Sequence, residues 1–206
     1  MKEHRAFAWR GLEEWRAEYT DVSLYADRLL ARGTQVGTDP VPYRLTYALD
    51  TAPGFVTARL TVDADGVSAR GARWARRLDL MRDGNGEWQV SCDARGDVEL
   101  PEPGGDPSAF AGALDCDLGF SPLTNSLPVL RERLLDGGDP HEFVMAWVSV
   151  PDLAVKRSEQ RYEPLARGQI RYVGRHRDFT AELEFDSDGF VVRYPQLAER
   201  VYPRPA

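Results

Sequence analysis

Apolar and polar residues alternate with a period of two through much of the chain, and this pattern constrains its fold more than any other feature. Every second residue is apolar in PYRLTYALD (residues 42–50), in VTARLTVDA (56–64) and in DFTAELEFD (178–186). Such alternation places the apolar side chains on one face of an extended strand. The segment EFVMAWVSV (142–150) is apolar on both faces, as in a strand buried on both sides. The sequence therefore predicts a mainly β protein.

Asp-Gly pairs and one Gly-Gly pair separate the predicted strands, at 65–66, 83–84, 137–138 and 188–189. Two of the Asp-Gly pairs end the motifs DADG and DSDG, which place two carboxylates beside a glycine as calcium loops do. Neither motif has the oxygen ligands and the closing glutamate of an EF-hand loop. Because Asp-Gly supplies the positive φ that tight turns require, we expect a hairpin turn at both motifs.

Helical periodicity is scarce. Residues 121–135 carry leucines at helical spacing, and Ser121 followed by Pro122 is typical of a helix start. Pro128 argues against one uninterrupted helix, so the alternative is an irregular turn followed by a strand. A second helix candidate is PQLAERVY, residues 195–202.

The stretch PEPGGDPSA (101–109) has the composition of a linker. It is either a long surface loop within one domain or the boundary of two domains near residue 105.

An internal similarity bears on that choice. TARLTVDADGVSAR (57–70) and TAELEFDSDGFVVR (180–193) share residues in order, and the tetrapeptide LARG precedes each, at 30–33 and 165–168. The two copies are either two similar β-meanders or a coincidence in a chain rich in Ala, Arg and Gly.

The formal net charge of −7 excludes a general attraction to nucleic acid or to anionic lipid. The N-terminus lacks the apolar run of a signal peptide, and no apolar window approaches the roughly 18 residues of a spanning helix. We therefore expect a soluble, cytoplasmic protein. Cys92 and Cys116 are interpreted as two buried thiols, with a disulfide or a redox role as the alternative.

Catalytic motifs are scarce. Asp115 and Asp117 lie two residues apart in LDCDLG, on one face of an extended segment, and would serve as general acid and base if their environments separated their pKa values. This supports a hydrolase or lyase as an alternative function, beside a structural role for both carboxylates. No metal-ligand spacing, serine-hydrolase elbow or nucleotide loop occurs, so we predict no metal, no cofactor and no catalytic residue.

Several segments of the second half follow one another in a characteristic order and spacing, and they are DCDLGFSPLTNSLPVLR (115–131), AWVSVPDLAV (146–155), EQRY (159–162), FTAELEFDSDGFVVRYP (179–195) and AER (198–200). Through these segments the chain resembles the DUF1089 family, also called the putative glycolipid-binding family. Shorter segments of the first half, WRGLE, YRLTYALD and GEWQV, extend the resemblance over nearly the whole chain.

The resemblance implies a single domain, residues 1–206, with a spiral β-roll fold in which a many-stranded, largely antiparallel sheet wraps around one helix. The prolines and Asn125 would then shape a corner beside the interior of the roll. Ser121 and Ser126 stand where the family pattern has threonines, and Leu130 replaces the first of two arginines, which leaves Arg131 alone. If the arginine pair of the family binds an anionic head group, this chain would bind such a group differently or more weakly.

The resemblance also implies a non-catalytic protein that binds a glycolipid or fatty acyl compound inside the roll or at its mouth. An acyl chain requires a cavity of about 300 Å³ or more. Without a ligand, the alternative is a structural homodimer module, since exposed strand edges favour association. The residues expected to bind are the aromatic residue Trp147 on the acyl side and the motif polar residues Asp115, Asp117, Asn125, Arg131, Gln160 and Tyr162.

Overall fold

The computed structural model describes residues 2–166, 168–175 and 179–204. Its described part is built on one sheet of fourteen strands. The strands are β1 (Glu3–Gly11), β2 (Arg16–Leu24), β3 (Leu29–Gly37), β4 (Tyr43–Thr51), β5 (Thr57–Val67), β6 (Arg73–Arg82), β7 (Trp88–Gly96), β8 (Asp115–Leu118), β9 (His141–Val148), β10 (Val155–Pro164), β11 (Gln169–Gly174), β12 (Phe179–Phe185), β13 (Val191–Tyr194) and β14 (Ala198–Tyr202).

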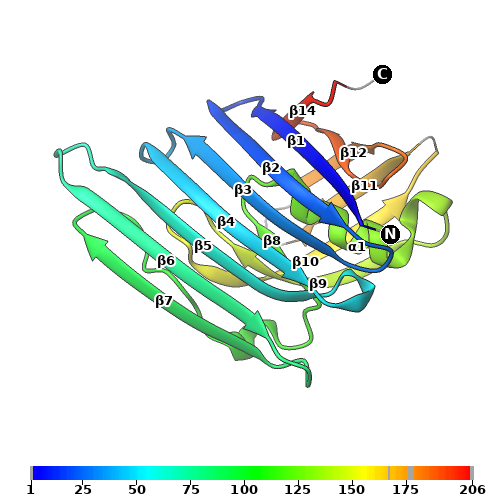
Figure 1. The fold of residues 1–206 in the computed structure, drawn as a ribbon, viewed down its shortest axis with the longest axis horizontal. Coiled ribbons are helices and arrows are strands. Elements are labelled where there is room, and N and C mark those ends of the chain that lie inside the picture. Colours follow the sequence, from blue (N-terminus) through cyan, green and yellow to red (C-terminus); the bar gives the residue numbers. More distant parts are fainter. Residues whose placement is uncertain (1, 167, 176–178, 205–206) are drawn as a thin grey trace.

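The strand order is β7-β6-β5-β4-β3-β2-β1-β14-β13-β12-β11-β10-β9-β8. Two meanders, one from each half of the chain, therefore meet where β1 pairs with β14. Neighbours are antiparallel except β8 and β9, which are parallel. Strands on both sides of the linker-like stretch at 101–109 thus belong to the same sheet (Figure 1).

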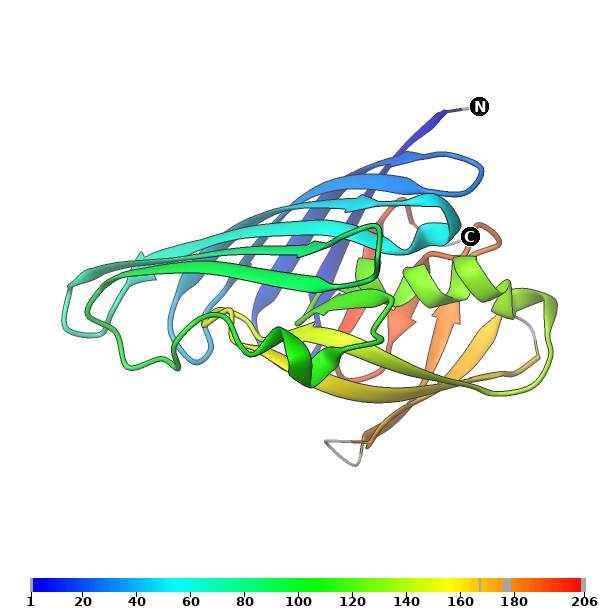
Figure 2. The same ribbon diagram turned by 90° about the horizontal axis from the view of Figure 1, so that it is seen from below.

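The sheet curls so that its first seven strands face the later strands as two layers, and the short helix α1 (Ser126–Glu132) lies between them (Figure 2). The end strands β7 and β8 do not pair with each other, so the roll stays open. This confirms the predicted fold class, a mainly β, largely antiparallel sheet wrapped around a helix.

The segment from residue 121 is helical rather than a turn followed directly by a strand. A 3₁₀ turn, η3 (Pro122–Asn125), leads into α1, and a further 3₁₀ turn, η4 (Leu134–Asp136), follows it. Pro122 occupies the first position of η3, where its missing N–H costs nothing. Pro128 is accommodated in the first turn of α1 for the same reason. The side chain of Ser121 does not cap η3, and it bonds elsewhere.

The predicted C-terminal helix at 195–202 is wrong. A turn closed by Leu197 N–H donating to Tyr194 O (3.0 Å) leads into β14. β14 pairs with β1 on one side and with β13 on the other. Two strand edges supply more backbone hydrogen bonds than a short isolated helix, and this tertiary pairing overrides the local pattern.

The hairpin predicted at DADG is also wrong. Residues 63–66 continue β5, which is paired along both edges, and the turn comes later, where Gly71 has φ +79°. Gly66 is needed because a Cβ there would lie 2.9 Å from the ring of Trp74. The hairpin at DSDG is confirmed, since Gly189 N–H donates to Asp186 O (3.1 Å) and Gly189 has φ +86°.

The internal similarity does not correspond to two equal meanders. The first LARG tetrapeptide lies inside β3, whereas Leu165, Ala166 and Gly168 of the second lie between β10 and β11, and Arg167 lies outside the described residues. The stretch at 101–109 packs against the end of β9 and the start of β10, where Gly104 N–H donates to Leu153 O (2.9 Å) and Val155 N–H donates to Gly104 O (2.8 Å).

The interior is filled mainly by the inward residues of the alternating strands, such as Leu45, Tyr47 and Leu49 on β4. The two cysteines differ from the interpretation as a pair of buried thiols. Cys116 is buried and free, whereas Cys92 is free but exposed, because the outer half of β7 is an uncovered edge strand.

Candidate functional site

A cavity of about 520 Å³ opens between the two layers, beside the corner that joins β8 to η3. Its wall combines aromatic rings from the corner and the later strands with acidic side chains from the connections of the first meander. The aromatic lining residues are Phe120, Trp147, Tyr172, Phe179 and Tyr194, and the charged ones are Glu13, Glu14, Arg16, Asp39 and Asp117.

The aromatic wall contains one packed cluster. The ring centroids of Tyr172 and Tyr194 lie 5.7 Å apart, and Phe179 lies 6.3 Å from the first and 6.1 Å from the second. Tyr172 also meets Tyr162 edge to face at 5.5 Å. These separations suit tilted and edge-to-face packing, so the rings hold one another in place and present a rigid surface to the cavity.

Two polar side chains of the corner reach the cavity, and buried partners fix both. Asp117 accepts hydrogen bonds from Gln160 Nε2 (2.6 Å) and Thr124 Oγ1 (3.2 Å). Asn125 donates through Nδ2 to the hydroxyl of Tyr162 (2.9 Å). Gln160 and Tyr162 are fully buried. They therefore orient Asp117 and Asn125 from behind the wall.

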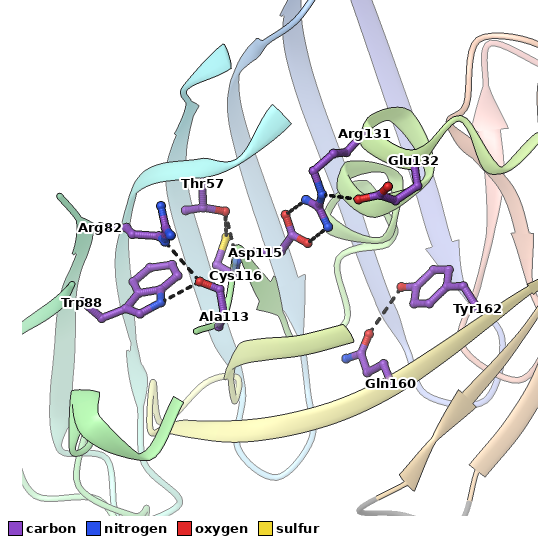
Figure 3. A network of polar contacts seen from close by, with 10 residues as sticks. All are labelled: Thr57, Arg82, Trp88, Ala113, Asp115, Cys116, Arg131, Glu132, Gln160 and Tyr162. Carbon is purple, nitrogen blue, oxygen red and sulfur yellow. Dashed lines mark hydrogen bonds and ion pairs between the residues drawn. The ribbon is translucent and has the colours of Figure 1, made fainter. Parts of the chain in front are cut away.

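Asp115 and Arg131 form a buried ion pair (Figure 3). Arg131 Nη1 and Nη2 donate to the two carboxylate oxygens of Asp115 at 2.6 and 2.8 Å, and Nε donates to Glu132 (2.9 Å). The guanidinium also lies 5.5 Å from the ring centre of Phe143. Burial raises the pKa of Asp115, and the bonds from Arg131 oppose that rise. The pair joins β8 to α1 and leaves neither charge free.

Further contacts hold β8 and the residues before it against the first meander (Figure 3). Ala113 O accepts from Trp88 Nε1 (3.0 Å) and Arg82 Nε (3.1 Å), and Thr57 Oγ1 accepts from Cys116 N–H (3.0 Å). The strand that presents Asp117 to the cavity is therefore held on the first-meander side as well as by β9.

The structure divides the residues expected from the sequence into three groups. Among the described residues that line the cavity are Asp117, Asn125 and Trp147. Gln160 and Tyr162 lie buried behind them, and Asp115 and Arg131 are paired with each other away from the lining. The acid–base hypothesis required Asp115 and Asp117 in one cleft, and only Asp117 reaches it.

Sequence reasoning missed Glu18, a carboxylate that is 5% exposed. It accepts hydrogen bonds from the hydroxyls of Tyr47 (2.6 Å) and Ser121 (2.7 Å), and Gln35 Nε2 lies 3.4 Å away. Burial raises its pKa to about 7, against the effect of these three bonds. The sequence of β2 did not indicate that Glu18 is buried, because the apolar residues beside it, Ala17 and Tyr19, face outward.

Arg16 was also missed. Its guanidinium stacks 4.3 Å from the ring centre of Phe120, and Nη2 donates to Leu197 O (2.9 Å). Burial lowers its pKa, and electrostatic interactions with Tyr43, Glu14, Glu13 and Asp39 act in the opposite direction. Nε is buried without a hydrogen-bond partner in the described structure. Nothing in the sequence indicated a role for Arg16, because a single arginine at the start of a strand is common on protein surfaces.

The described residues contain neither a metal cluster nor a membrane span. No group of three or more His, Cys, Asp or Glu side chains in this part of the chain is placed to hold a metal ion. No helix among these residues is long and apolar enough to cross a bilayer.

Fold and cavity together define an open antiparallel β-roll that encloses one short helix and an amphiphilic pocket. The sequence model of the family described as "Putative glycolipid-binding" matches residues 6–200, so the chain belongs to that family. A crystal structure of a DUF1089 family protein from Pseudomonas aeruginosa is similar, with a TM-score of 0.68 and 26% sequence identity over 94% of this chain and 95% of that one. A comparison with curated proteins found no significant match.

Proposed function

We propose that this protein binds an amphiphilic molecule of the glycolipid type in the cavity beside the β8–η3 corner, without catalysing a reaction. The observation that carries the proposal is the lining itself. A rigid aromatic wall faces polar groups that buried partners hold in fixed orientations. The volume of about 520 Å³ lies in the usual range of small-molecule sites, about 300–1,000 Å³.

The two sides of the cavity suit the two parts of such a ligand. Aromatic rings cover the C–H faces of a sugar or an acyl chain, while carboxylate and amide groups meet hydroxyls. Burial of each CH₂ contributes about 0.8 kcal/mol, so even a short acyl segment would supply useful affinity. In this proposal Trp147 contacts the apolar part, and Asp117 and Asn125 contact the polar part.

The remaining motif residues have a supporting role in this proposal. Gln160 and Tyr162 orient Asp117 and Asn125, and the Asp115–Arg131 pair fixes α1 to β8. We also infer that residues 1–206 act as one domain, because both meanders contribute to a single sheet and to the cavity wall.

Native mass spectrometry of the protein purified from cells, followed by titration with a panel of glycolipids and fatty acyl compounds, tests the proposal. We expect a retained or added amphiphile at one-to-one stoichiometry. Trp147→Ala should weaken binding at least tenfold, because it removes a large part of the wall. The matched control is Trp15→Ala, since Trp15 is 66% exposed and is not among the described lining residues. Absence of any bound amphiphile, or equal loss in both variants, would contradict the proposal.

A further inference from the structure

The charges around the cavity bear on the head group of the ligand, so the inference drawn from them rests on the proposed function. Glu13, Glu14 and Asp39 are exposed and belong to the lining. None of the three forms an ion pair within the described part of the chain. Among the described lining residues, Arg16 is the one cationic side chain. Among the described lining residues, these three exposed carboxylates therefore face one guanidinium, and the fourth lining carboxylate, Asp117, is held by Gln160 and Thr124.

Arg16 is already engaged by the protein. Phe120 covers one face of its guanidinium, and Leu197 O accepts from Nη2. The three carboxylates also act electrostatically on this group. Its charge therefore offsets at most one of them. Counting only Arg16, Glu13, Glu14 and Asp39, the described residues at the cavity mouth retain an excess of about two negative charges, to which Asp117 does not contribute in this count.

The other arginine that could have received an anion is already occupied. Arg131 is held by Asp115 and Glu132, and its side chain is only 9% exposed. An incoming phosphate or carboxylate would have to displace a bidentate ion pair that is already desolvated. Such pairs are costly to break, because they leave a buried charge without compensation.

From these contacts we propose that the cavity accepts an uncharged, hydroxyl-bearing head group and disfavours head groups that carry a carboxylate, phosphate or sulfate. Ionised carboxylates only accept hydrogen bonds, so Glu13, Glu14 and Asp39 match the hydroxyl donors of a neutral sugar. An anion at the same place meets like charges and gains no donor from them.

A matched pair of ligands tests this, decyl glucoside and decyl glucuronide, which differ by one carboxylate on the same ring. Isothermal titration calorimetry at neutral pH and low ionic strength should give about tenfold weaker binding for the glucuronide, as expected for two excess charges at about 8 Å. The difference should shrink at about 1 M salt, where the Debye length is about 3 Å.

A triple variant, Glu13→Gln/Glu14→Gln/Asp39→Asn, should bring the two affinities within about threefold of each other. The control variant Asp97→Asn/Glu102→Gln/Asp139→Asn changes the net charge equally at exposed positions outside the described lining, and the tenfold difference should persist.

The outcomes separate the two proposals. If the glucoside binds and the glucuronide binds equally or more tightly, the head-group inference is overturned while the binding function stands. If neither binds, the proposed function fails and the inference fails with it. If both triple variants bind the two ligands with similar affinity, the discrimination comes from the overall charge of the protein. The proposed role of Glu13, Glu14 and Asp39 is then overturned.

Discussion

The hydroxyl of Ser121 donates a 2.7 Å hydrogen bond to the carboxylate of Glu18, which lies 103 positions earlier in the chain. The bond ties the corner after β8 to β2 across the interior. Tyr47 donates to the same carboxylate oxygen (2.6 Å), so one buried acid connects β2, β4 and the corner. Ser121 also lines the cavity, and its wall therefore depends on this acid.

Glu18 should make stability depend on pH. Its pKa rises from 4.5 to about 7 on folding, so the folded state holds the proton more tightly. The stabilisation is present below about pH 4.5 and is lost as pH rises through about 7, by ~3 kcal/mol at most. Glu18→Gln should remove this loss of stability with rising pH. The buried Oε1 of Gln35, which has no partner within the described structure, can accept a hydrogen bond from the new amide.

Urea unfolding of both proteins between about pH 4.5 and pH 8 measures the effect as a difference in free energy of unfolding. The control is Glu102→Gln, an exposed glutamate that should leave the wild-type pH dependence unchanged. Parallel pH profiles for Glu18→Gln and the wild type would show that Glu18 is not the responsible group.

Arg131→Met should destabilise the fold by about 3–5 kcal/mol, because it leaves the carboxylate of Asp115 buried and unpaired. Adding Asp115→Asn should recover part of that loss, so the double variant is less destabilised than the sum of the single ones. Arg70→Met is the control. Its ion pair with Glu99 is exposed on both sides, and we expect a change below about 1 kcal/mol. Strict additivity in the double-mutant cycle would contradict the assignment.

Gly33→Ala should destabilise the protein by about 1–3 kcal/mol, since a Cβ at Gly33 would lie 2.3 Å from the ring of Tyr47. The ring must then move, and with it the hydroxyl that donates to Glu18. Gly84→Ala is the matched control, because a Cβ there meets nothing within 4 Å and φ is not positive. Thermal unfolding of both variants tests this prediction. Equal unfolding midpoints for Gly33→Ala and Gly84→Ala would refute it.

The two thiols should react differently with a thiol reagent. Cys92 is exposed, whereas burial raises the pKa of Cys116 to about 12, so it lacks both access and thiolate. We expect one labelled thiol per native chain and two in denaturant, counted by mass spectrometry. Cys92→Ser should abolish labelling of the native protein, and residual labelling would show that Cys116 is accessible.

The alternating pattern was sufficient to predict strands wherever one face is buried and the other exposed, as along β4 and β12. It failed where the interior is polar. In β2 the buried positions hold the polar residues Glu18 and Thr20. The alternation of apolar and polar residues therefore predicts the opposite face of this strand as the buried one. Only the hydrogen-bond partners from β3, β4 and the corner make those inward positions tolerable, and local sequence rules do not include such partners.

The family motifs lie beside the cavity, and their spacing did not predict which of their side chains line it and which lie behind the lining. Asp115 and Asp117 share one face of β8, as their spacing predicted. Arg131 pairs with the first, and Gln160 and Thr124 bond to the second, at distances in sequence that no spacing rule covers.

The sequence alone determined the β-rich fold class, because a pleated strand buries every second side chain and the chain shows this period of two in its apolar residues. Tertiary structure decided which polar groups line the cavity and which support it, and it made residues 198–202 a strand. The physical reason is the same in each case. A backbone edge or a buried polar group takes the partner that the curled sheet brings to it, and that partner lies far away in the sequence.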